Sequence, residues 1–80
     1  MKLPRDVSGD DLIRALSHMG YTPTRQTGSH VRLTTDHGGV HHITIPLNDP
    51  LKIGMLNALV KDIGEHHGLT RNEVLSLLFQ

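Results

Sequence analysis

Two short segments, residues 30–34 and 40–45, alternate between polar and apolar side chains on either side of the glycine-containing turn at 36–39. This alternation is typical of two paired β-strands whose opposite faces differ in polarity. In the first segment, Val31 and Leu33 point to one face and the polar side chains to the other. Because the apolar face needs a cover, the rest of the chain must supply it.

Segments with helical spacing on both sides of these strands can supply that cover. The first helix is predicted over residues 9–19 with Ser8 as its N-cap. The second is expected to follow the N-cap segment 48–50 with proline at its first position, and the third to follow a capping box at 70–73. The apolar residues of the two later helices are expected in the core: Ile53, Leu56, Leu59, Val60, Ile63, Val74, Leu75, Leu77 and Leu78.

A third strand is predicted over residues 21–26, where Pro23 suits an edge position. The resulting order, α-β-β-β-α-α, predicts an α+β fold with a three-stranded antiparallel sheet and the helices packed on one face. The other sheet face is left open to solvent or to a ligand. Eighty residues are too few for two folded units, so we expect a single domain over 1–80. Five polar side chains are predicted to share the open face: His30, Arg32, Thr34, His42 and Thr44.

Composition excludes several classes of function. The chain has no cysteine, which excludes disulfides, thiolate metal sites and cysteine nucleophiles. Eight basic and eight acidic residues give a net charge of zero, which lacks the basic signature of a nucleic-acid-binding protein. No apolar run is long enough for a membrane span and the first residues do not resemble a signal peptide, so a cytoplasmic location without membrane contact is expected.

Histidine is the residue type in which we look for chemistry, because the chain has seven of them. Imidazole transfers protons near neutral pH with little tuning. His30 is the first candidate, since it follows a Gly-Ser turn and shares a strand face with Arg32. An imidazole beside a guanidinium suits cleavage of a phosphodiester by the adjacent 2′-hydroxyl, a reaction that needs no metal. The competing interpretation is an ordinary polar strand surface.

The histidine doublets do not predict a metal site. Neighbours on a strand point to opposite faces and neighbours on a helix lie about 100° apart, so neither His41 and His42 nor His66 and His67 chelate as a pair. No metal or other cofactor is therefore predicted. At the C-terminus, Phe79 is expected to be exposed and available to a partner.

Several motifs together resemble the HicA toxin family, small mRNA interferases of bacterial and archaeal toxin–antitoxin pairs. The resemblance covers nearly the whole chain, including the first predicted helix. That family has a fold like the double-stranded-RNA-binding domain, which agrees with the architecture predicted from periodicity. The matching residues are Gly28, Ser29 and His30 at a hairpin, Ile45 and Pro46 at the end of a strand, and Leu51, Lys52, Gly54, Met55 and Leu56 after it.

The resemblance implies a ribonuclease that cuts mRNA and is silenced by a HicB-type antitoxin. His30 matches the histidine of the family's Gly-Ser-His motif and is the predicted catalytic residue. We expect Arg25, Arg32 and Lys52 to contact phosphates and to offset charge in the transition state. The complete set of predicted RNA-binding residues is Arg25, Ser29, Arg32, His42 and Lys52.

Two positions depart from the family pattern. Asn48 stands where the family often has a second histidine, and Met55 where threonine is common. An amide hydrogen-bonds but does not exchange protons at neutral pH, so His42 is the alternative partner if strand register brings it near His30. Two other functions stay open: a catalytically inactive RNA-binding module of the same fold, and a protein-interaction domain.

Overall fold

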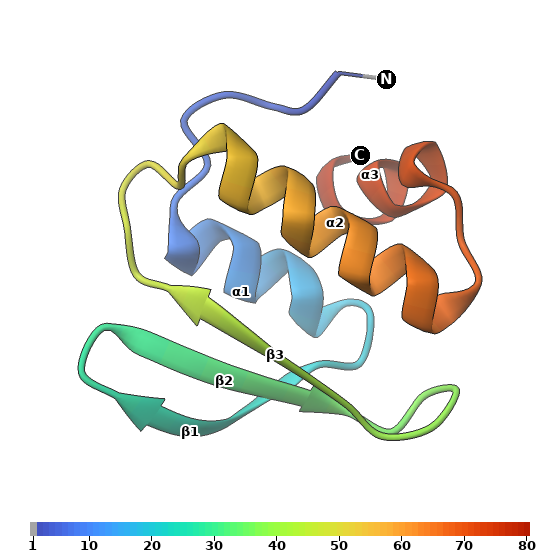
Figure 1. Ribbon diagram of the computed structural model, residues 1–80, viewed down its shortest axis with the longest axis horizontal. Helices are drawn as coiled ribbons and strands as arrows, with labels where there is room; N and C mark the ends of the chain where they lie inside the picture. Colours follow the sequence, from blue (N-terminus) through green and yellow to red (C-terminus); the bar gives the residue numbers. More distant parts are fainter. Residues whose placement is uncertain (1) are drawn as a thin grey trace.

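The computed structural model describes residues 2–80 and places three helices and three strands in that part of the chain (Figure 1). This order confirms the predicted α-β-β-β-α-α arrangement and the α+β fold class. No helix in residues 2–80 is long and apolar enough to cross a membrane. The elements are α1 (Gly9–Ser17), β1 (Thr22–Thr27), β2 (His30–Thr35), β3 (His41–Pro46), α2 (Ile53–His67) and α3 (Arg71–Phe79).

The strands form one antiparallel sheet with β2 between β1 and β3. Val31 is paired with Ile45 and Leu33 with Ile43, and all four side chains are buried. The period-two alternation therefore places apolar side chains on the inner face, as the sequence predicts.

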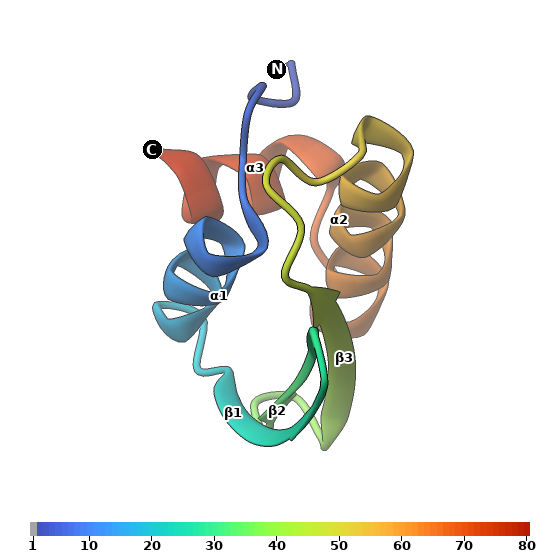
Figure 2. The same ribbon diagram turned by 90° about the vertical axis from the view of Figure 1, so that its left-hand side faces the viewer.

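The three helices lie on one side of the sheet, and its other side is uncovered (Figures 1 and 2). The core fills the space between these layers and includes residues from every helix. Tyr21, just before β1, is only 1% exposed, although the sequence places it in a polar edge strand. The largest fully buried side chains are Tyr21, Leu12, Leu16, Leu33, Ile45, Leu56, Ile63, Leu75, Val60 and Val74.

Helix α1 is held at its start by a capping box and by close packing against the end of β3. The Ser8 hydroxyl accepts a hydrogen bond from the Asp11 amide at 3.0 Å, and the Asp11 carboxylate accepts one from the Ser8 amide at 3.1 Å. The Gly9 amide donates to the Asn48 carbonyl at 2.9 Å. A Cβ added at Gly9 would lie 2.1 Å from the Pro46 carbonyl oxygen, so this position has room for glycine alone.

The start of α2 differs from the prediction. The segment 48–50 does not cap the helix, which begins at Ile53 with Lys52 as an N-cap that makes no side-chain hydrogen bond. The chain before it is instead held to the N-terminal segment, because the Leu51 amide donates to the Val7 carbonyl at 2.7 Å. Ile53, predicted in the core, is 51% exposed.

Smaller differences lie at other element ends. Helix α1 ends at Ser17 rather than at residue 19, β1 spans Thr22–Thr27 rather than 21–26, β2 extends to Thr35, and β3 begins at His41 rather than at Val40. In α3 the Thr70 capping box is confirmed.

The two ends of the apolar pattern in α3 also differ from the prediction. Leu77 is 54% exposed because Val74, Leu75 and Leu78 take the inward face of the helix. Phe79, predicted to be exposed, is partly buried and packs against the core.

Candidate active site

His30 lies at the first position of β2, where the backbone is held from both sides. It follows the Gly28–Ser29 turn, in which Gly28 has a φ of +56°, a conformation that disfavours other residues. It pairs with Thr27 of β1 and with Pro46 of β3. The Leu47 amide donates to the Ser29 carbonyl at 2.7 Å and ties the turn to the segment after β3. The His30 side chain is exposed on this fixed backbone.

The open face of the sheet carries a shallow hollow around His30. We call it the open-face hollow, and it is lined by Arg25, Thr27, His30, Arg32 and Thr44. The register explains this set, because Thr27 is opposite His30, while Arg25 and Thr44 flank Arg32 on the two neighbouring strands. Side chains directly opposite each other in a sheet share a face.

Three predicted site residues, Arg25, His30 and Arg32, thus meet in the open-face hollow. Thr27 and Thr44 were not among the predicted site residues. A two-residue turn at Gly28 and Ser29 already places Thr27 opposite His30, so the sequence held the signal for Thr27.

The electrostatics of the open-face hollow favour an anion. Its lining includes two guanidinium groups and no carboxylate. Within residues 2–80 the salt bridges include Arg14 with Asp11 and His41 with Asp62, and neither arginine of the hollow takes part in one. Guanidinium groups bind phosphate oxygens in a bidentate manner, and the hydroxyls of Thr27 and Thr44 add donors beside them.

His42 shares the open face but is not close to His30. It is paired with Thr34, whereas His30 is paired with Pro46, so the two histidines lie four residues apart along β2 and β3. That separation is about 13 Å at the usual rise of a strand. Nδ1 of His42 is 2.8 Å from the Thr34 hydroxyl, which in turn is 2.9 Å from the hydroxyl of Thr24. The register condition for His42 as the acid–base partner of His30 is therefore not met.

The other predicted residues lie outside the lining of the open-face hollow. Ser29 is in the turn before His30, and Lys52 is exposed at the start of α2 in the helix layer. Asn48 follows Leu47, which bonds to the Ser29 carbonyl, so the position that departs from the family pattern lies near the Gly-Ser turn. Asn48 is exposed.

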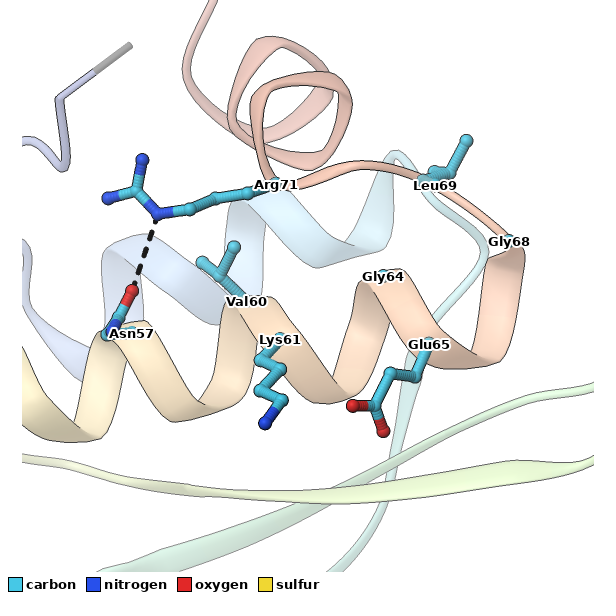
Figure 3. Close-up of a pocket in the computed structure, with 8 residues that line it drawn as sticks. All are labelled: Asn57, Val60, Lys61, Gly64, Glu65, Gly68, Leu69 and Arg71. Carbon is cyan, nitrogen blue, oxygen red and sulfur yellow. Dashed lines mark hydrogen bonds between the residues drawn. The ribbon is translucent and has the colours of Figure 1, made fainter.

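A second hollow lies between α2 and α3, on the helix layer (Figure 3). Figure 3 shows Arg71 reaching back to Asn57, and its Nε donates to the Asn57 side-chain oxygen at 3.4 Å. Lys61 and Glu65 project from α2 on the side away from Arg71. The lining holds one carboxylate and two cations but no histidine, so it lacks a group that exchanges protons readily at neutral pH.

Histidines from two distant parts of the sequence meet at the other end of β3. Tyr21 hydroxyl lies 2.7 Å from His41 Nδ1 and 3.0 Å from His67 Nε2, and the rings of His41 and His66 are stacked with centroids 4.3 Å apart. Burial, with a smaller effect of Asp62, raises the pKa of Tyr21 to about 12. The phenol of Tyr21 therefore stays protonated at neutral pH and does not act as a base.

Sequence reasoning missed this cluster because it treated the doublets one at a time. Each doublet sends one histidine, His41 or His66, into the same stack across the sheet–helix interface. Within residues 2–80, no group of three or more histidine, aspartate or glutamate side chains is arranged to hold a metal ion.

Comparison with known proteins identifies a family. The family model described as the HicA toxin of bacterial toxin–antitoxin matches residues 9–65, which include α1, the whole sheet and most of α2. The chain matches no curated protein and no solved structure.

Proposed function

Because this chain belongs to the HicA toxin family of bacterial toxin–antitoxin systems, we propose that it is an endoribonuclease that cleaves mRNA with His30. The observation that supports the proposal is the position of an exposed imidazole in one hollow with two guanidinium groups free of salt bridges. Family membership gives the class of toxin, and the composition of the hollow supports the proposed chemistry.

The reaction that fits this hollow is attack of a ribose 2′-hydroxyl on the neighbouring phosphorus. The bond from the 2′-oxygen to phosphorus forms as the bond to the 5′-oxygen breaks, leaving a 2′,3′-cyclic phosphate and a 5′-hydroxyl. His30 either takes the proton from the 2′-hydroxyl or gives one to the departing 5′-oxygen. Arg25 and Arg32 offset the charge that gathers on the phosphoryl oxygens.

His30 is the one imidazole in the lining of the open-face hollow, as the structure of residues 2–80 describes it. A single histidine assists one of the two proton transfers directly, and the other is left to water. Asn48 holds the position of the family's second histidine and does not exchange a proton at neutral pH. We therefore expect slow, metal-independent cleavage.

RNA binding is proposed to extend beyond the open-face hollow. His42 shares its sheet face, Ser29 belongs to the turn at its edge, and Lys52 adds a cation at the start of α2. Phosphate contacts of this kind position the strand without reading its sequence. A HicB-type antitoxin is the proposed partner that silences the toxin in the cytoplasm.

The first test is expression of the chain alone in bacteria, with growth compared between the parent and His30→Ala. We expect the parent to arrest growth and the variant to be tolerated. His18→Ala is the matched control, because it removes an exposed histidine that does not line the open-face hollow. Equal toxicity of His30→Ala and the parent would contradict the assignment.

The second test uses purified protein and a defined RNA in buffer with EDTA. We expect products with 2′,3′-cyclic phosphate ends, and no cleavage at a linkage whose 2′-hydroxyl is methylated. Binding that weakens with salt but is never followed by cleavage would instead select the inactive RNA-binding module.

A further inference from the structure

We infer that Tyr21, His41, His66 and His67 form an acid-sensitive histidine clasp, which holds the C-terminal end of α2 to the sheet while its imidazoles are neutral and releases it when they are protonated. His41 is at the start of β3, and His66 and His67 are the last two residues of α2. His41 pairs with Thr35 at the end of β2 opposite to His30. The inference does not rest on the proposed nuclease function.

The hydrogen bonds of the histidine clasp determine which nitrogen of a neutral His41 ring carries the hydrogen. Its Nε2 lies 3.2 Å from the Asp62 carboxylate, which only accepts, so Nε2 carries the hydrogen. In a neutral ring Nδ1 is then the acceptor, and it takes the hydrogen of the Tyr21 hydroxyl at 2.7 Å. The Tyr21 oxygen is in turn left to accept from Nε2 of His67 at 3.0 Å.

His66 extends the histidine clasp to the turn between β2 and β3. Its Nε2 lies 2.9 Å from the His37 carbonyl and 3.1 Å from the Gly39 carbonyl, so it donates to this turn. Its ring stacks on His41 with an angle of 10° between the planes, and His67 meets it edge-on at 4.7 Å. One helix end is thus joined to a strand and to a turn through imidazole rings.

Protonation works against this arrangement. A proton on His41 Nδ1 opposes the hydrogen that Tyr21 donates to it. Protons on His66 and His41 together place two like charges in rings 4.3 Å apart. Asp62, with a side chain that is 53% exposed, offsets the charge of one imidazolium. A second charge is not compensated.

The other ionisable groups around the histidine clasp are mostly histidines, and Asp36 belongs to the turn to which His66 donates. His37 of the β2–β3 turn and His18 after α1 line one hollow together with His67, while α3 contributes Leu77 there. Glu65 of α2 lines the hollow between α2 and α3 instead. Asp62 is therefore the one carboxylate bonded to the cluster within residues 2–80.

The direction of the pH effect follows from His67. Burial, and then the neighbouring His66, His41 and His37, lower its pKa. The unfolded chain therefore binds more protons than the folded one as the pH falls below about 6.5, the ordinary value for histidine. Stability is full above that pH and is lost as the pH falls through the lowered value of the folded protein.

The test compares thermal melting of the full chain at pH 7.5 and at pH 5.5, in a His30→Ala background that avoids toxicity. We expect the melting temperature to fall by about 5 °C or more at the lower pH. The double variant His66→Gln with His67→Gln should lose most of this difference, because glutamine keeps an N–H donor but binds no proton. His42→Gln, on the open face, is the control that should keep it.

Amide hydrogen exchange locates the change within the same His30→Ala protein. At pH 5.5 we expect the last turn of α2 and residues 37–40 to lose protection, after correction for intrinsic exchange, while Leu33 in the central strand keeps it. An equal pH difference in the double variant, no difference in the parent, or unchanged protection at the end of α2 would each overturn the inference.

Discussion

The two ends of the sheet use the same residue type in opposite ways. At one end His30 is exposed on the open face beside two arginines. At the other end the histidine clasp lies between sheet and helix, bonded to a tyrosine that is 1% exposed. The first arrangement leaves an imidazole free to meet a ligand, and the second uses hydrogen bonds from its ring nitrogens to join parts of the fold.

The comparison shows that the surroundings of a histidine decide its role more than its position in the sequence does. His41 and His42 are neighbours on one strand, yet one joins the histidine clasp and the other lies on the open face. Variants at each end should therefore separate activity from stability.

The largest effect is expected from His30→Ala. Removal of a general acid or base costs about 10²- to 10⁴-fold in rate, so RNA cleavage should fall by that factor. Stability should stay within about 0.5 kcal/mol, because the side chain is exposed. Single-turnover cleavage and urea unfolding measure the two quantities. A large loss of stability would show that this end, too, is structural.

The next effect is expected from Tyr21→Phe at the other end. The change leaves His41 Nδ1 and His67 Nε2 without the hydroxyl that bridges them, which should cost about 1–3 kcal/mol of unfolding free energy. Cleavage per folded molecule should not change. Urea unfolding at pH 7.5 measures the loss of stability, and a cleavage assay at low temperature measures the activity of the folded protein. A loss of cleavage without a loss of stability would show that the histidine clasp contributes to activity.

A smaller effect is expected from Arg32→Gln. The loss of one guanidinium should reduce cleavage about tenfold, equivalent to about 1.4 kcal/mol in the transition state. The dependence of RNA binding on salt should weaken by about one phosphate contact. Arg14→Gln is the matched control, because Arg14 lies on α1 and pairs with Asp11. Equal losses in the two variants would point to overall charge rather than to the open-face hollow.

The smallest effect is expected from Asn48→His, and it is a gain. A second imidazole near the Gly-Ser turn should assist the proton transfer that is otherwise left to water, and raise cleavage by a factor of about 3–10. The rate at several pH values in the parent and the variant checks it. An unchanged rate would mean that residue 48 does not reach the reacting linkage.

The fold could be predicted from the sequence wherever a local rule sufficed. Period-two alternation placed Val31 and Leu33, and the Thr70 capping box placed the start of α3. The start of α2 could not be predicted, because Leu51 is bonded to Val7, a contact between distant segments. The sequence Asn48-Asp49-Pro50 favoured an N-cap at that point, but α2 begins later, at Ile53.

The open-face hollow was predictable in part for the same reason. His30 and Arg32 share a face by alternation within one strand, and the register set by the Gly28–Ser29 turn places Arg25 opposite Arg32. The irregularity in β1 lies beyond that pair, between Pro23 and Arg25. The histidine clasp depends on packing between β3 and α2, which no spacing along the chain reveals. Side chains brought together by tertiary contacts were therefore the part that sequence reasoning missed.

Gly9 lies outside the open-face hollow, yet its substitution is expected to disturb the fold near His30. Even the Cβ of alanine there would clash with the Pro46 carbonyl oxygen at the end of β3 and with Leu47 just after it. The Leu47 amide steadies the turn before His30. A single methyl group at the first residue of a helix is thus expected to impair the proposed nuclease while every residue proposed to bind RNA is retained.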